Sequence, residues 1–158
     1  MKKGNLIKLL LSLILTNSAG YLGSLFTTLA IRGWYATLNR PSLAPPNWVF
    51  APVWTTLFVL MAIAFYLVIK DWKSDKTHRL AVWFFAIQLI LNTFWSILFF
   101  GLNRIDLALV EIFVLLLFII LTAIQFAKIK KWAAYLLLPY IGWVMFAAFL
   151  NFSFWRLN

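Results

Sequence analysis

The sequence predicts an all-α protein that crosses a membrane as a bundle of five helices, in one domain over residues 1–158. Three observations predict this class. Apolar residues make up 65% of the chain and the mean hydropathy is +0.93, both high for a soluble domain. The apolar residues form five stretches, each long enough to cross about 30 Å of hydrocarbon as a helix. Charged residues lie almost entirely in the short gaps between them.

The first predicted helix covers residues 6–31. The chain starts with Met-Lys-Lys, so a signal peptide ending near Ala19 is the alternative. We favour a retained span because apolar residues continue well beyond that point. Small residues recur at every fourth position and permit close approach of a neighbouring helix or of a second subunit. The two sets are Ser12, Thr16 and Gly20, and Ala19, Gly23 and Thr27.

A proline-rich connector precedes the second helix. Four of the five prolines fall within residues 34–61, so the first part of that region cannot be one continuous helix. Three tryptophans are interleaved with them. We predict that residues 32–47 form an ordered lid, and that residues 48–69 form a helix with Pro52 in its opening turns. The alternative is an interfacial connector whose Trp and Tyr lie at headgroup level.

The remaining predicted helices cover residues 79–101, 104–127 and 132–155. Asn103 has the spacing of an N-cap for the fourth helix, with Asp106 as its N3 partner.

Basic residues are distributed unequally between the two ends of these helices. Ten of the fourteen lie at one end and four at the other. Cytoplasmic loops carry the excess of Lys and Arg, so we predict a multi-pass protein of the cell membrane with a cytoplasmic N-terminus. The lid and the C-terminus would lie outside. The net charge of +10 therefore indicates orientation in a membrane, and no nucleic-acid partner is expected. The ten are Lys2, Lys3, Lys8, Lys70, Lys73, Lys76, Arg79, Lys128, Lys130 and Lys131.

Three predicted helices each pair large aromatic side chains with few amides on one face, at steps of three and four. These faces share the half of the membrane beneath the lid, where they would line a pocket for a flat ligand. The alternative is ordinary helix packing with the amides hydrogen-bonded across it. The faces are Trp54, Phe58, Met61 and Phe65; Gln88, Asn92, Trp95 and Phe99; and Trp143, Ala147, Leu150 or Asn151, and Phe154.

Titratable residues are few: four acids, one histidine and no cysteine. Disulfides, thiolate chemistry and Cys-ligated metals are therefore excluded. His78 falls in the turn before the third helix, so no histidine is available within the membrane to ligate a haem iron, and no metal site is predicted. Glu111 is the one acid well inside a predicted helix. It is either a proton relay or ligand partner, or a neutral structural acid.

Three stretches carry a recognisable pattern, and the first is so dense in Pro and Trp that chance recurrence is rare. The residues are Trp34-Tyr35, Leu38, Arg40-Pro41, Pro45-Pro46, Trp48, Phe50, Pro52-Val53-Trp54 and Met61; Gln88, Asn92, Trp95 and Phe99-Phe100; and Pro139-Tyr140, Trp143, Phe146-Ala147 and Leu150-Asn151. Together they resemble the signature of the TspO/MBR family, which includes tryptophan-rich sensory proteins and the peripheral benzodiazepine receptor. The resemblance runs from the first predicted helix to Arg156.

The resemblance implies a five-helix bundle, commonly a homodimer, with a ligand pocket beneath the first loop. Family ligands include porphyrins, isoquinoline carboxamides and benzodiazepines. Protoporphyrin IX is therefore the expected ligand or substrate, and no covalently bound cofactor is expected. The residues expected to bind the ligand are Tyr35, Arg40, Pro45, Trp54, Phe58, Asn92, Trp95, Trp143, Ala147, Leu150 and Asn151.

Bacterial members of the family are described as promoting light-dependent oxidative breakdown of protoporphyrin. If this carries over, Trp54 and Trp143 are the residues expected to carry the chemistry, and whether the protein is an enzyme stays open. Two alternatives remain: a small transporter of tetrapyrroles or other amphiphiles, with Glu111 as its relay, and a non-catalytic ligand-binding scaffold.

Overall fold

All five predicted helices are present in the computed structural model, which describes residues 3–158 and contains no strand in that range. Each is long and apolar enough to cross a membrane, so the chain is an all-α, multi-pass membrane protein. Lys2, counted above among the basic residues, lies outside the described residues. The spans are α1 (Lys3–Ile31), α3 (Phe50–Ile69), α4 (Lys76–Ser96) with its π-helical end η2 (Ile97–Gly101), α5 (Ile105–Ile129), and α6 (Lys131–Tyr135) followed by α7 (Leu138–Leu157).

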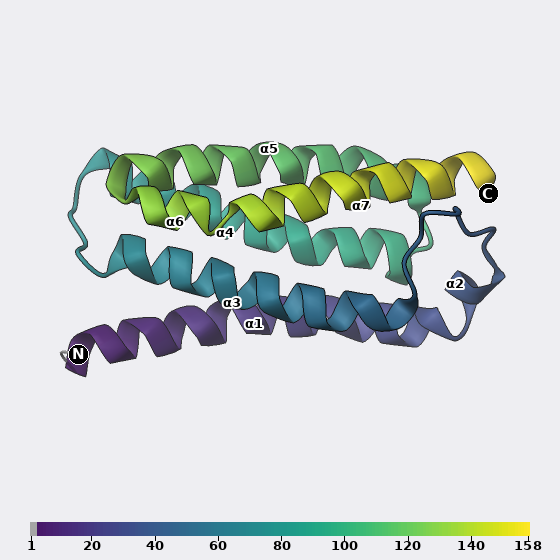
Figure 1. Cartoon of the computed structure of the whole chain (residues 1–158), viewed down its shortest axis with the longest axis horizontal. Coiled ribbons are helices and arrows are strands. Elements are labelled where there is room, and N and C mark those ends of the chain that lie inside the picture. The colour runs from purple at the N-terminus through teal and green to yellow at the C-terminus, as the bar shows by residue number, and fades with distance from the viewer. Residues whose placement is uncertain (1–2) are drawn as a thin grey trace.

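The spans run side by side along the long axis of the molecule, and the two termini lie at opposite ends (Figure 1). α4 and α5 form the most extensively packed pair, α1 packs against α3 and α4, and α7 packs against α5. The connector between α1 and α3 lies at the same end as the C-terminus (Figure 1). We call this the lid end, and the opposite one the amino-terminal end.

Local chemistry sets where α3 and α4 begin. A 3₁₀ turn, η1 (Asn47–Val49), leads into α3, and Pro52 lies in the first turn of α3, where a missing N–H costs least. α4 begins at Lys76, earlier than the predicted residue 79. The reason is Asp75, whose carboxylate accepts a hydrogen bond of 2.9 Å from the His78 backbone N–H and so caps the helix.

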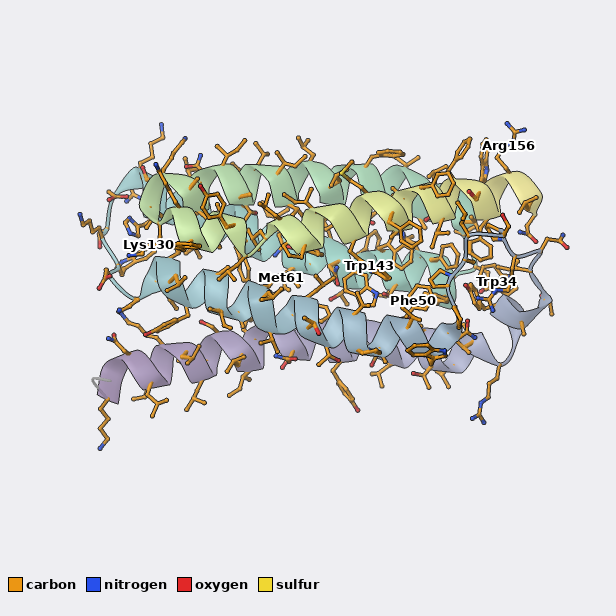
Figure 2. All side chains as sticks on the ribbon, viewed as in Figure 1. Trp34, Phe50, Met61, Lys130, Trp143 and Arg156 are labelled. Atoms are coloured by element: carbon orange, nitrogen blue, oxygen red, sulfur yellow. The ribbon has the colours of Figure 1, made fainter. Side chains whose placement is uncertain are left out.

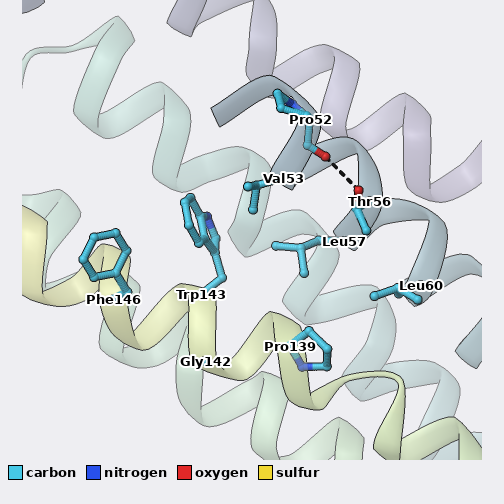
Figure 3. Close-up of a pocket in the computed structure, with 9 residues that line it drawn as sticks. All are labelled: Pro52, Val53, Thr56, Leu57, Leu60, Pro139, Gly142, Trp143 and Phe146. Atoms are coloured by element: carbon cyan, nitrogen blue, oxygen red, sulfur yellow. Dashed lines mark hydrogen bonds between the residues drawn. The ribbon is translucent and has the colours of Figure 1, made fainter. Parts of the chain in front are cut away.

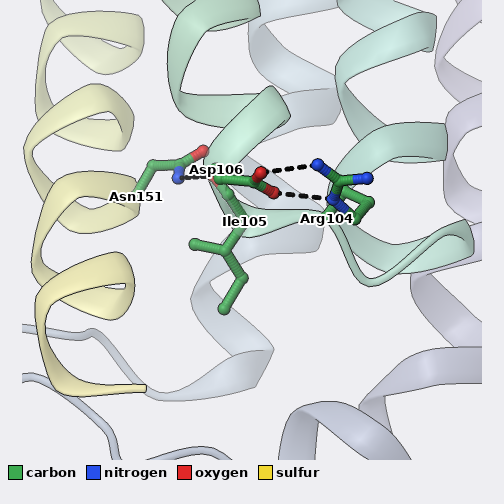
Figure 4. A network of polar contacts seen from close by, with 4 residues as sticks. All are labelled: Arg104, Ile105, Asp106 and Asn151. Carbon is green, nitrogen blue, oxygen red and sulfur yellow. Dashed lines mark hydrogen bonds and ion pairs between the residues drawn. The ribbon is translucent and has the colours of Figure 1, made fainter.

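The predicted cap of α5 is wrong. Asn103 has a φ of 55°, in the left-handed region, and belongs to the turn before the helix. Arg104 occupies the cap position without a side-chain cap bond. Its guanidinium instead donates to both carboxylate oxygens of Asp106, at 2.9 and 2.6 Å (Figure 4). Both side chains are exposed, so this ion pair contributes little to stability.

The fifth span is interrupted, whereas the sequence predicted one helix over residues 132–155. A turn at residues 136–137 separates α6 from α7, and Pro139 lies in the first turn of α7. A proline has no N–H to donate and its ring crowds the preceding turn, so Pro139 starts a new helix instead of continuing the old one. α6 packs against α5 and also contacts α3, whereas α7 packs mainly on α5.

The small residues of α1 face the interior of the bundle. Ser12 is 1% exposed, and a Cβ added at Gly20 would overlap the Phe58 ring of α3. A Cβ added at Gly23 would lie 3.1 Å from the Ser96 hydroxyl oxygen of α4. The four-residue spacing therefore serves close packing within the chain, and these residues are not free to contact a second subunit.

Candidate ligand cavity

The lid over the bundle is ordered by aromatic and cationic contacts. The stretch predicted as an ordered lid, residues 32–47, opens with a short helix, α2 (Trp34–Thr37). Tyr35 is 5% exposed and packs against Phe154 of α7, with ring centres 5.4 Å apart. The guanidinium carbon of Arg40 lies 5.5 Å from the Tyr35 ring centre. Burial raises the pKa of the Tyr35 phenol, and the positive charge of Arg40 offsets this in part.

Hydrogen bonds tie the lid to the end of α7. The Asn39 backbone N–H donates to Asn158 Oδ1 at 2.8 Å, and Asn158 Nδ2 donates to the Asn39 carbonyl at 3.2 Å. Asn39 Nδ2 also donates to the Leu157 carbonyl at 3.2 Å. We call these three bonds the lid latch. Within the lid, Arg40 Nη2 donates to the Pro45 carbonyl at 3.0 Å.

A cavity of about 370 Å³ lies beneath the lid, within the usual size range of small-molecule sites. Its walls come from α1, the lid, α3, α4 with η2, and α7, and they are mainly apolar. Seven of the eleven predicted ligand-binding residues border it: Tyr35, Trp54, Phe58, Asn92, Trp95, Trp143 and Ala147.

The other four predicted residues do not border the cavity. Arg40 and Pro45 are bonded to each other in the lid. Leu150 is 6% exposed and faces the protein interior elsewhere on α7. Asn151 accepts a hydrogen bond of 3.0 Å from Trp95 Nε1, so it lies behind the cavity wall and supports it.

The three cavity tryptophans differ in their contacts. Trp54 packs against Phe58 at 5.7 Å between ring centres. Trp95 is fixed through its indole N–H by Asn151. Trp143 packs against Phe50 at 6.0 Å, and its buried Nε1 has no hydrogen-bond partner among residues 3–158. Figure 2 shows Trp143 and Phe50 together in the lid half of the bundle.

A chain of hydrogen bonds runs from the cavity wall into the core. Asn92 Nδ2 donates to the Tyr140 hydroxyl at 2.9 Å, and that hydroxyl donates to Gln88 Oε1 at 3.1 Å. Tyr140 and Gln88 are both buried. The packing and pocket hypotheses for this face are therefore not exclusive, since Asn92 bonds across the helices and also borders the cavity.

One wall of the cavity was not predicted from the sequence. α1 contributes Gly20, Gly23, Ser24 and Thr27 to the cavity lining. The signal was the four-residue spacing of small residues, which we interpreted only as a packing motif. Asn47, the first residue of η1, also borders the cavity.

Glu111 lies on α5, which contributes no residue to the cavity lining. It is 7% exposed, and neither carboxyl oxygen has a hydrogen-bond partner in the described part of the chain. His78 lies at the amino-terminal end of the bundle, near Trp72. Neither residue faces a ligand in the cavity.

The fold and the cavity define a class: polytopic, all-helical membrane proteins that enclose a ligand-sized space beneath an ordered loop. Sequence comparison narrows this class, because the profile of the TspO/MBR family matches residues 12–156. The chain belongs to the TspO/MBR family.

Several relatives match over nearly their whole length. The chain is 43% identical to the tryptophan-rich protein TspO of Chlorobaculum tepidum, covering 97% of both chains. It is 41% identical to the tryptophan-rich protein TspO of Archaeoglobus fulgidus, covering 98% of this chain and 99% of the relative. It is 34% identical to the translocator protein of Bos taurus, covering 92% of this chain and 86% of the relative.

Proposed function

We propose that this protein binds a flat, largely apolar ligand of the porphyrin class in the cavity beneath the lid, and promotes its light-dependent oxidative breakdown. The observation that carries the proposal is the gathering of Trp54, Trp95 and Trp143 around one cavity. Indole rings stack on flat conjugated systems, and the polar edge of Asn92 can orient such a ligand. Isoquinoline carboxamides and benzodiazepines, which are also flat and aromatic, are proposed for the same site.

The charge distribution at the lid supports a porphyrin with propionate groups. Arg40 packs on Tyr35, which borders the cavity, so a positive charge lies one side chain away from a mainly apolar space. Carboxylates bind guanidinium groups strongly in such surroundings. No histidine borders the cavity, so its residues suit a metal-free porphyrin such as protoporphyrin IX better than an axially ligated haem.

In the proposed mechanism the excited ligand performs the chemistry and the protein orients it. Light excites the bound porphyrin, which accepts an electron from an adjacent indole and passes it to dioxygen, so that superoxide forms. The indole cation radical recovers an electron from the porphyrin, which is left oxidised by one electron. Superoxide then adds to this oxidised ring, and a methine bridge is cleaved with both oxygen atoms retained in the open-chain product. Dioxygen is the final oxidant. Trp54 and Trp143 are the proposed donors. Trp95 already uses its indole N–H in a bond to Asn151, so its proposed role is to present a fixed ring face.

Illumination of the purified protein with protoporphyrin IX tests this function. We expect the porphyrin absorption to be replaced by that of a bilin-like product, and Trp54→Phe or Trp143→Phe to slow the change about tenfold or more. Trp83→Phe is the matched control, because Trp83 is 66% exposed and remote from the cavity. Bleaching at the same rate in detergent alone would refute the proposal.

One observation favours a second candidate, transport of tetrapyrroles or other amphiphiles. Glu111 is a buried acid in a membrane span without a hydrogen-bond partner among the described residues, which is characteristic of proton relays. Reconstituted vesicles would then show saturable porphyrin flux that Glu111→Gln abolishes. Unchanged flux in Glu111→Gln would exclude this relay.

We further propose that the protein functions as a homodimer in the cell membrane, with its N-terminus in the cytoplasm and its lid outside. The excess of Lys and Arg at the amino-terminal end supports the orientation. The small residues of α1 are occupied within the chain, so the proposed dimer contact uses a lipid-facing surface instead.

A further inference from the structure

A second concave space lies beside the cavity, on the surface of the bundle between α3 and α7. It measures about 610 Å³ and is open on one side (Figure 3). We call it the α3/α7 groove. The Thr56 hydroxyl in its lining already donates to the Pro52 carbonyl at 2.8 Å, so the groove presents an essentially hydrocarbon surface. Its other main lining residues are Val53, Leu57, Leu60, Pro139, Gly142 and Phe146.

Trp143 is the wall that the groove shares with the internal cavity, because it borders both spaces. Its ring centre lies 6.0 Å from that of Phe50, which borders the cavity. It lies 5.6 Å from that of Phe146, which borders the groove. Figure 3 shows the indole standing between α7 and Val53 of α3. A rotation of this one side chain would join the two spaces.

The Trp143 ring is not anchored by polar contacts. Its Nε1 forms no hydrogen bond within the described chain, whereas Trp95 Nε1 is held by Asn151 at 3.0 Å. The preceding residue, Gly142, leaves room beside it, since a Cβ added there would meet no atom within 4 Å. Rotation of Trp143 therefore breaks no hydrogen bond, and it has free volume on the groove side.

Access past the lid is more obstructed than access past Trp143. The lid latch contributes three hydrogen bonds between the lid and α7. The Arg40 to Pro45 bond and the buried Tyr35 ring add to it. A ligand entering past the lid must break several of these contacts, and it must first leave the bilayer, where an apolar porphyrin-like molecule is concentrated.

We propose that the α3/α7 groove is the entrance through which a flat apolar ligand dissolved in the bilayer reaches the cavity, with the Trp143 indole as the partition that swings aside. The proposal rests on the ligand class proposed above and adds the route of entry. The groove is then a transient binding site for the same ligand, in contact with lipid on one side and with the indole on the other.

Filling the groove tests the route. Gly142→Leu places a side chain in its open volume without a backbone clash. The rate at which protoporphyrin IX passes from vesicles into the reconstituted protein can be measured from the quenching of tryptophan fluorescence. We expect this rate to fall about tenfold in Gly142→Leu. Release should slow equally, because a blocked passage changes both rates and leaves Kd unchanged. Met145→Leu is the control, since Met145 lies on α7 outside the groove and is 56% exposed.

A lid variant separates the two routes. Asn158→Ala removes two bonds of the lid latch and should leave both rates unchanged if the ligand enters laterally. Faster exchange in Asn158→Ala with unaltered exchange in Gly142→Leu would overturn the lateral route and support entry past the lid. A changed Kd in Gly142→Leu would also overturn it, by making the groove part of the final site. No saturable binding to the unmodified protein would refute the proposed function, and the route with it.

Discussion

A single amide, that of Asn151, fixes one of the three cavity tryptophans, Trp95. Asn151 donates through Nδ2 to the Ile105 carbonyl of α5 at 2.9 Å (Figure 4). It also accepts from Trp95 Nε1, so one side chain links α4, α7 and α5. Asn151 is 1% exposed, and both ends of its amide are bonded. Buried amides satisfied in this way hold their partners in one geometry. Asn151 therefore positions the Trp95 ring without touching the cavity.

Replacement of this amide should destabilise the protein and loosen the ring. Asn151→Leu conserves volume but leaves Trp95 Nε1 buried and unpaired, so we expect unfolding in detergent to become easier by about 1–3 kcal/mol. Phe152→Leu, at an exposed neighbouring position, is the control. The double variant with Trp95→Phe should recover part of the loss, since the unpaired donor is then absent. Strict additivity of the two changes would contradict the role assigned to Asn151.

The sequence predicted three walls of the cavity, because aromatic residues at helical spacing mark one face whatever the tertiary structure. Arg40 and Asn151 were expected to contact the ligand; in the structure Arg40 donates to the Pro45 carbonyl and Asn151 accepts from Trp95, and neither residue borders the cavity. Spacing places a residue on a face, but it does not reveal whether its polar atoms are already bonded. The α1 wall was missed because glycine and serine at this spacing are equally typical of helix packing.

At the scale of the helices, the lengths of the apolar stretches were sufficient to predict that five spans exist and where each lies in the sequence, because the thickness of the hydrocarbon layer sets a minimum helix length. The ends depended on local hydrogen bonds that composition does not specify. Asp75 starts α4 early, Asn103 is in a left-handed turn, and Pro139 divides the last span. Each deviation follows from one or two residues acting on the backbone.

The cap of α4 makes a prediction about pH. Hydrogen bonds from the His78 backbone N–H and side chain lower the pKa of the Asp75 carboxyl below its ordinary value of 3.8. The stabilisation is therefore complete above that ordinary value and is lost as the pH falls through the lowered pKa. Asp75→Asn keeps a capping oxygen but does not titrate. The unfolding temperature of the unmodified protein should fall more steeply than that of Asp75→Asn below pH 3.8. Parallel curves would refute the cap's contribution.

At the scale of the whole molecule, the bundle has two chemically different ends. The amino-terminal end gathers most of the lysines, and the lid end carries the C-terminus. Because the chain contains no cysteine, a single introduced thiol reports on one side of the membrane without background.

That property allows the proposed orientation to be measured. Leu43→Cys lies in the lid at a position that is 63% exposed, and Lys73→Cys lies in the exposed turn between α3 and α4. A membrane-impermeant maleimide applied to intact cells should label the first variant and spare the second until the cells are lysed. The reverse pattern would place the lid in the cytoplasm.

The interruption of the last span bears on how a ligand reaches the cavity from the side of the bundle. α6 contacts both α5 and α3, and from Pro139 the chain continues as α7, which packs mainly on α5. Beyond Pro139 few residues of α7 pack on α3, and the α3/α7 groove lies along this seam. Pro139 thus both starts α7 and lines the groove, so Pro139→Ala alters the helix junction and the groove together.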